Sequence, residues 1–207
     1  MELSNITKHY EDNAIARVIV NAIPYIGGSV DVLLTQRWSR IRQQRIDDLL
    51  EKISVELSEI KETAVTKETL ESEEFYDLVF QIASNAISSR CGETRVGYAR
   101  VIKTALNKEE TFTNLEDIVR QIAGLTEKDL LYLKTIKALF DESDSVSGIT
   151  VTHMSSIHNT DIEAELQLYR FENLGLLDHP RNTLVGRGKM PFSKMPLFDI
   201  VVSYLGL

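Results

Sequence analysis

The sequence predicts an all-α protein, in which a helical bundle built on one long helix precedes a smaller helical module with a small β-hairpin. Two observations lead to this prediction. Apolar residues recur three and four positions apart over most of the 207 residues, which is the period of an amphipathic helix. Serine, threonine, glycine and proline separate these runs at positions where helices typically begin and end. We expect two domains, residues 1–124 and 125–207.

Composition places the chain among ordinary globular proteins, with 43% hydrophobic and 26% charged residues. The net charge of −8 argues against general nucleic-acid binding, because that requires a basic face that displaces counterions. The one cysteine, Cys91, excludes an intrachain disulfide and fits a reducing compartment. With no pattern of a cleavable signal peptide, these features predict a cytoplasmic protein, with peripheral membrane attachment as the alternative.

An apolar arm, residues 14–34, is the first element. Proline and paired glycines break it at Pro24 and at Gly27–Gly28, since both residue types stop helices. We therefore expect two short helical segments joined at a bend. A membrane span needs about 20 apolar residues with few charges. The polar and charged interruptions in this run are Arg17, Asn21 and Asp31, so a spanning helix is not expected.

A long helix follows the arm, with Ser29 as its expected N-cap and an end near Lys61. Its length is on the order of 45–50 Å at 1.5 Å per residue. This exceeds what a small core needs, so part of the helix should pack on other helices or on a second copy. Its apolar positions are Val30, Leu34, Trp38, Ile41, Ile46, Leu49, Ile53, Leu57 and Ile60.

The arm and the start of the long helix together predict an interaction surface for self-association or for another protein. Its expected residues are Ile19, Val20, Ile23, Leu33, Leu34, Trp38 and Ile41. An apolar segment followed by basic residues and a tryptophan is also typical of an interfacial membrane anchor. The basic residues are Arg37, Arg40, Arg42 and Arg45, and carboxylates within helical reach that could pair with them are Asp47, Asp48 and Glu51. Burial and membrane contact both remain open.

The next helices are predicted from apolar faces and caps. One helix is expected over Lys67–Arg90, a break at Gly92, and a second helix over Arg95–Leu106. Thr113–Glu116 has the Thr-x-x-Glu pattern of a capping box and predicts a helix that ends near Gly124.

The C-terminal part begins with a similar helix start at Thr126–Asp129. After a polar loop, Asp141–Gly148, Thr160 caps a helix that runs through Asn173 and is closed by Gly175. The glycine-containing segment Asn182–Lys189 predicts a hairpin or flexible wing. Pro196 then opens a terminal helix over Leu197–Tyr204.

This order of helix, loop with a short helix, helix, hairpin and helix resembles winged-helix domains. The resemblance implies that Asp161–Asn173 would be the helix that enters the DNA major groove. That helix carries Asp161, Glu163, Glu165 and Glu172 against Arg170 alone, and carboxylates are repelled by phosphates. DNA binding is therefore the alternative to protein contacts. The wing residues Arg181, Arg187 and Lys189 are basic and would suit a phosphate or an acidic partner.

Catalytic chemistry is not indicated. His153 and His158 are five apart and fall on different helix faces, whereas a zinc pair on one helix is spaced i, i+4. Gly27–Gly28 is not followed by the lysine of a phosphate-binding loop. We expect no enzyme, no cofactor, no metal and no small-molecule substrate.

Four segments carry a resemblance to a group of uncharacterised bacterial helical proteins, some of them associated with abortive infection or phage defence. The segments are Ala22–Leu34, Arg42–Ile46, Leu70–Leu78 and Tyr98–Ile102. The resemblance implies an intracellular bacterial effector or accessory subunit that acts through association or membrane disturbance. It supplies no catalytic motif, so no functional residue follows from it.

Overall fold

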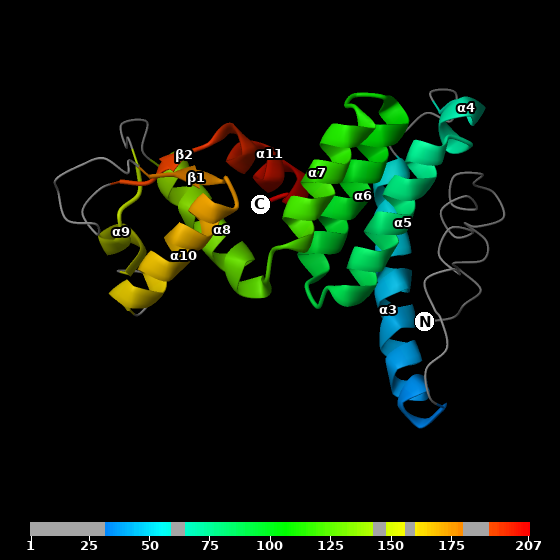
Figure 1. Cartoon of the computed structure of the whole chain (residues 1–207), viewed down its shortest axis with the longest axis horizontal. Coiled ribbons are helices and arrows are strands. Elements are labelled where there is room, and N and C mark those ends of the chain that lie inside the picture. The colour runs from blue at the N-terminus through cyan, green and yellow to red at the C-terminus, as the bar shows by residue number, and fades with distance from the viewer. Residues whose placement is uncertain (1–31, 59–64, 143–147, 156–159, 180–190) are drawn as a thin grey trace. The chain divides into compact units, whose positions relative to one another are not determined.

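The computed structural model describes residues 32–58, 65–142, 148–155, 160–179 and 191–207, with side chains from Arg40 onward in the first range. These residues are helical apart from a short antiparallel ladder, which confirms the all-α prediction with a small β-hairpin (Figure 1). The chain divides into two compact units, Met1–Gly124, called unit 1, and Leu125–Leu207, called unit 2.

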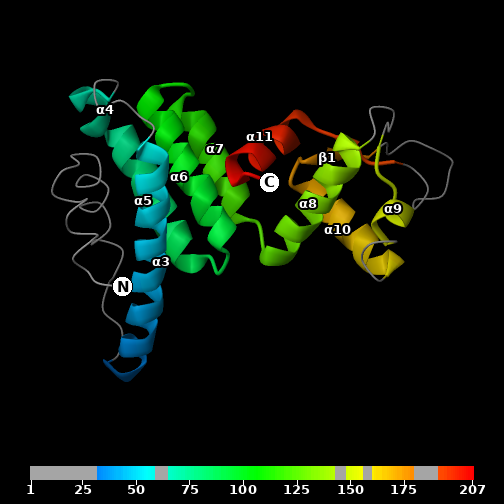
Figure 2. The same ribbon diagram turned by 180° about the vertical axis from the view of Figure 1, so that it is seen from behind.

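Unit 1 is a bundle. Its elements are α3 (Val32–Leu57), α4 (Lys67–Leu70), α5 (Glu73–Ser88), α6 (Gly92–Asn107) and α7 (Phe112–Ala123). The longer helices lie side by side: α3 packs on α5 and α6, and α7 packs on the same two helices (Figure 1, Figure 2).

Burial at helical spacing holds unit 1 together. On α3 the buried positions Leu49, Ile53 and Leu57 are each four apart, so they form one stripe toward the bundle. Each fully buried large apolar side chain contributes about 1.5–3 kcal/mol relative to exposure. The other helices supply the rest of this core, with the buried residues Phe75, Leu78, Ile82, Tyr98, Ile102, Leu115, Val119 and Ile122.

The long helix is present as α3, but its predicted end near Lys61 was wrong. The helix ends at Leu57, and the Ser58 hydroxyl donates to the Val55 carbonyl at 2.7 Å in the closing turn. The predicted cap, Ser29, lies outside the described residues. In two opposite views the N-terminal turns of α3 extend beyond the ends of α5 and α6 (Figure 1, Figure 2).

The single helix predicted over Lys67–Arg90 was also wrong, because the chain breaks between α4 and α5. Ser72 has extended backbone, with ψ 145°, and its hydroxyl accepts the Phe75 amide at 3.2 Å. Leu70 and Phe75, on the two sides of the break, are five residues apart, so the three- and four-residue spacing is interrupted there. Gly92, predicted as the break between two helices, is instead the first residue of α6, so the predicted start of that helix at Arg95 was three residues late.

The predicted capping box at Thr113–Glu116 was wrong by two residues. Helix α7 begins at Phe112, and its N-cap is Thr111, whose hydroxyl accepts the Asn114 amide at 3.3 Å.

Unit 2 begins with α8 (Glu127–Asp141), α9 (Val151–Ser155) and α10 (Asp161–Asn173). Strand β1 (Leu177–Asp178) pairs antiparallel with β2 (Ser193–Lys194), with Leu177 opposite Lys194, and α11 (Pro196–Leu205) follows. Ile149, between α8 and α9, forms a bridge to Phe192. The strands flank the predicted hairpin segment 182–189, which lies outside the described residues. This is the element order expected of the winged-helix-like module.

Local chemistry explains the helix boundaries of unit 2. The box predicted at Thr126 is confirmed, since the Thr126 hydroxyl accepts the Asp129 amide while the Asp129 carboxylate accepts the Thr126 amide. The predicted bounds of Asp161–Asn173 are confirmed as α10, with Thr160 as the N-cap. Gly148 lies where a Cβ atom would stand 2.6 Å from Pro191 Cβ, so only glycine allows the Ile149–Phe192 bridge to close.

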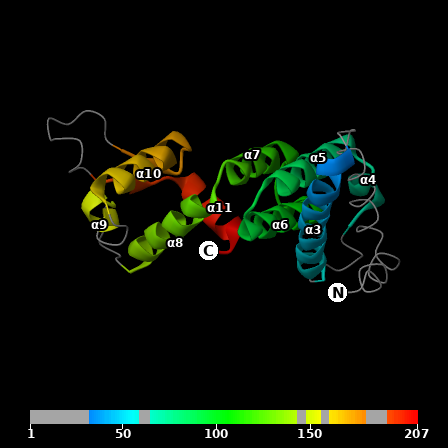
Figure 3. The ribbon, with the colours of Figure 1, turned by 90° about the horizontal axis from the view of Figure 1, so that it is seen from below.

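The core of unit 2 lies among its helices and the short ladder, with α9 packed against α10 (Figure 3). Its fully buried residues are Leu133, Ile136, Ile149, Met154, Leu168, Phe171, Phe192, Phe198 and Val201.

Candidate interaction surface

The described structure places only part of the predicted interaction surface. Leu33, Leu34 and Trp38 lie on α3, where the helix but not the side chains is described, and Ile41 is half-buried on the same helix. The remaining predicted residues lie outside the described residues: Ile19, Val20 and Ile23 of the arm, and Arg181, Arg187 and Lys189 of the wing.

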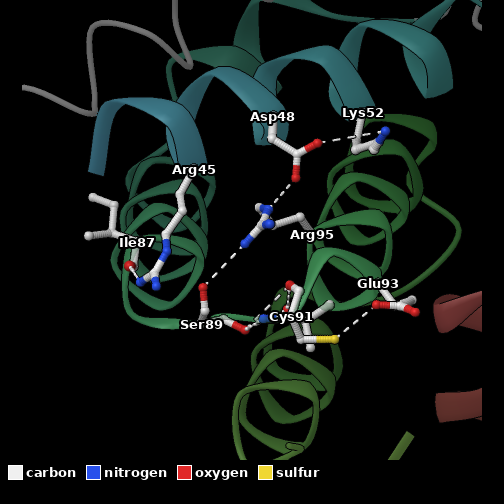
Figure 4. Close-up of polar contacts among 9 residues, drawn as sticks. Arg45, Asp48, Lys52, Ile87, Ser89, Cys91, Glu93 and Arg95 are labelled. Carbon is white, nitrogen blue, oxygen red and sulfur yellow. Dashed lines mark hydrogen bonds and ion pairs between the residues drawn. The ribbon is translucent and has the colours of Figure 1, made fainter. Parts of the chain in front are cut away.

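The charged residues of α3 bind other helices of unit 1. Arg45 donates to the Ile87 carbonyl at the end of α5, and Asp48 pairs with Arg95 of α6 as well as with Lys52 (Figure 4). Asp48 therefore pairs with Arg95 and Lys52, and not with the arginines of its own helix as the sequence had suggested.

Arg95 connects three segments of unit 1. It is 8% exposed, and besides Asp48 it donates to the Ser89 carbonyl at 3.2 Å (Figure 4). One turn and two turns further along α6, Arg100 and Lys103 donate to the two carboxylate oxygens of Glu56 at 3.0 and 3.2 Å. These contacts fasten α6 to α3, so we interpret them as structural.

Cys91 is buried at the start of α6, and its thiol donates to a Glu93 carboxylate oxygen at 3.0 Å (Figure 4). Burial, together with this hydrogen bond to a carboxylate, raises the pKa of the Cys91 thiol. The thiolate is the nucleophilic form, so the geometry keeps this cysteine unreactive.

The described residues show neither a metal-binding cluster nor a membrane-spanning helix. Across the described ranges there is no cluster of three or more histidine, cysteine, aspartate or glutamate side chains able to hold a metal ion. In the same part of the chain, no helix combines the length and the apolar character that crossing a membrane requires.

Helix α10 has two different faces. Its buried side carries Ala164, Leu168 and Phe171, which pack into the core of unit 2. The opposite side exposes two large aliphatic side chains one turn apart, Ile162 at 73% and Leu166 at 67%. Large apolar side chains this exposed on adjacent turns form a patch that water solvates poorly.

Carboxylates run along one edge of this apolar stripe. At 3.6 residues per turn, Asp161, Glu165 and Glu172 follow one another on the same side of the helix. On the opposite edge, Glu163 is paired with Lys128 of α8, and Arg170 is paired with Asp129. We call Ile162 and Leu166, with the carboxylates Asp161 and Glu165 beside them, the α10 face.

Arg170, the basic residue of α10, forms an ion pair with Asp129 of α8. Arg170 Nε lies 2.8 Å from Asp129 Oδ1, and Arg170 Nη2 lies 3.0 Å from Oδ2, a bidentate geometry. Burial alone would raise the pKa of the Asp129 carboxyl, but hydrogen bonds from Arg170, Thr126 and Gln167 outweigh it and lower that pKa. The hydrogen bond to Asp129 raises the pKa of the Arg170 guanidinium. Arg170 is thus committed to α8.

Tyr169 joins the end of α10 to the ladder. Its ring meets Phe192 edge-to-face at 5.4 Å between centroids and His179 at 5.7 Å. His179 is 7% exposed, and its Nε2 atom has no hydrogen-bond partner among the residues that the structure describes. These ring contacts hold α10 against the residue that follows β1 and the residue that precedes β2.

The acidic charge of this helix was predicted from the sequence, whereas the exposed apolar pair Ile162 and Leu166 was not. The sequence does contain a sign of this face, because Ile162 and Leu166 lie opposite Ala164, Leu168 and Phe171 on a helical projection. A helix with apolar residues on both sides is either buried all round or carries an exposed apolar face, and the sequence does not say which.

No protein-family model, no curated protein and no solved structure matches this chain.

Proposed function

We propose that this chain is a non-enzymatic interaction protein that binds another polypeptide through the α10 face. The observation that supports this proposal is the exposure of Ile162 and Leu166 on the helix that would read DNA in a winged-helix domain. Covering two such side chains with a partner removes apolar area from water, which is the main driving force of protein association. A binding role of this kind agrees with the expected effector or accessory subunit of a bacterial defence system.

The α10 face supports protein contacts better than DNA contacts. Its carboxylates would stand where a DNA-reading helix approaches phosphates, and its arginine is held by Asp129. The DNA alternative therefore depends on the wing residues Arg181, Arg187 and Lys189, which lie outside the described residues.

Self-association through α3 is a second candidate. It is favoured by the N-terminal turns of α3, which extend beyond the neighbouring helices of unit 1 (Figure 2). The exposed part of α3 includes Arg40 and Arg42, with Ile41 half-buried between them. The membrane alternative for the arm uses the same end of this helix.

A site-specific crosslinking experiment tests the proposal. A photoreactive benzoylphenylalanine is placed at position 166 of the full chain, which is expressed in the cells from which it comes. The matched control carries the same residue at Ala138, an exposed position on α8 of the same unit. We expect illumination to yield an adduct with a second polypeptide from position 166 and none from position 138.

Failure of the proposal has a distinct result. The same label is then placed at position 162 in a second chain. If positions 162 and 166 both give no adduct while the labelled chains melt like the unlabelled chain, the α10 face is not a docking surface.

A further inference from the structure

We infer that the occupant of the α10 face is an amphipathic helix of a partner protein, with lysine or arginine residues beside its apolar side chains. The inference rests on the proposed function of this face and adds the chemistry of the partner.

The shape of the face favours a helix. Ile162 and Leu166 are four residues apart and so form a short ridge along α10. Ridges of this spacing fit the grooves between the side-chain rows of a second helix. Asn173 is exposed further along the same side, so the 13 residues of α10 offer about 20 Å of contact length.

The charges of the face select a basic partner. Asp161 and Glu165 form no ion pair among the described residues, and they border the apolar stripe on one edge. Two cations beside the opposite edge of α10 are engaged elsewhere, Lys128 with Glu163 and Arg170 with Asp129. A partner that brings cations along its edge satisfies Asp161 and Glu165, whereas an acidic partner adds repulsion.

A second copy of this chain fits the same face poorly. Two copies of α10 packed antiparallel through this stripe would set the edge with Asp161 and Glu165 against its own counterpart. Like charges in that position are destabilising, and each chain carries a net charge of −8. Charge complementarity therefore points away from self-pairing at α10.

Peptide binding to the full chain tests the inference. The probe is a fluorescein-labelled 14-residue helical peptide of leucine and lysine, about four turns long, and its matched control replaces every lysine by glutamate. We expect the leucine–lysine peptide to bind, the leucine–glutamate peptide not to bind, and the affinity to fall with added salt. Fluorescence anisotropy measures all three.

Variants locate the site. We expect the double substitution Ile162→Gln and Leu166→Gln to weaken binding by at least about tenfold, because both anchors lose their apolar area. The pair Asp161→Asn and Glu165→Gln should weaken it by roughly fivefold. The matched control, Glu68→Gln with Asp77→Asn, removes the same charge from exposed positions of unit 1 and should leave the affinity within about twofold.

The opposing results are distinct. The inference is overturned if both peptides bind equally well. It is also overturned if neither set of α10 substitutions changes the affinity for the basic peptide. An adduct at position 166 without peptide binding leaves the proposed function standing and rejects the basic helix. An adduct between two copies of this chain rejects it in favour of self-pairing. A circular-dichroism melt of each variant confirms that the chain is folded.

Discussion

Asp129 accepts hydrogen bonds from the backbone and hydroxyl of Thr126, from Gln167 and from Arg170, although it is only 1% exposed. One carboxylate thus completes the cap of α8 and fixes α10 against it. A buried carboxylate is tolerated only when such partners replace the water it has lost. The orientation of the α10 face therefore depends on this residue.

We predict that Asp129→Asn lowers the free energy of unfolding of unit 2 by roughly 1–3 kcal/mol at neutral pH, because a charge-assisted bidentate pair becomes a neutral contact. The pKa of the Asp129 carboxyl is lower in the folded state than in the unfolded chain. The stabilisation by ionised Asp129 is therefore complete at pH values above the carboxyl pKa of the unfolded chain, near 3.9. It is lost as the pH falls through the lower pKa of the folded chain.

Thermal melts of the wild type and Asp129→Asn between about pH 7 and pH 2 check this prediction. The two melting temperatures should converge at the acid end. A difference that stays constant over the whole range would show that the charge of Asp129 is not the stabilising element.

A second prediction concerns Tyr98, which is fully buried in α6 with a hydroxyl that has no hydrogen-bond partner within the described part of the chain. Burial raises the pKa of this phenol far above its usual value. Tyr98→Phe removes the unsatisfied group and keeps the ring, so we expect an unchanged or higher melting temperature. A loss of stability would reveal a hydrogen bond that this structure does not contain.

Sequence reasoning succeeded for single residues where the partners are close in the chain. The caps Thr126 and Thr160 were predicted because their hydrogen bonds span three residues. The pairing of Asp129 with Arg170 spans 41 residues and was not predicted. It depends on how α8 and α10 pack, which one sequence does not encode in any local pattern.

At the scale of elements, the ion pairs between α3 and α6 differ in burial. Arg95 is nearly buried and satisfies both Asp48 and a backbone carbonyl, whereas the side chain of Arg100 is 33% exposed and shares Glu56 with Lys103. Buried pairs are costly to break because a charge is left without a partner, while exposed pairs contribute little.

We therefore predict that Arg95→Met costs about 2 kcal/mol of stability. The matched change Arg100→Met should cost under about 1 kcal/mol. Urea denaturation followed by circular dichroism gives both values. Equal costs would mean that burial does not decide the strength of these contacts.

Helix boundaries show where periodicity fails. Leu70 and Phe75 are five residues apart, off the three- and four-residue helical spacing, and Ser72 between them is the N-cap of α5. Serine is compatible with a helix interior as well as with a cap, so the sequence pattern alone leaves both readings open. The all-α class was predictable because it depends on the sum of many positions, whereas each boundary depends on one or two.

On the scale of the whole molecule, each unit has its own buried core, formed around Phe75, Ile82 and Tyr98 in unit 1 and around Phe171, Phe192 and Phe198 in unit 2. A core of its own is what a segment needs to fold alone. We predict that fragments 1–124 and 125–207, expressed separately, are helical and melt cooperatively. Circular-dichroism melting checks this, and a fragment without a transition would show that its core needs the other unit.

The bridge between Ile149 and Phe192 has a mechanical consequence. Its two backbone hydrogen bonds, each 2.8 Å, close a loop of chain that contains α9, α10 and β1. When the two ends of unit 2 are pulled apart, tension runs along α8, crosses this bridge and continues into α11. While the bridge holds, the backbone of the enclosed segment carries none of this tension, and α10 is loaded only through its contacts with neighbouring elements, such as the ion pair between Arg170 and Asp129 of α8.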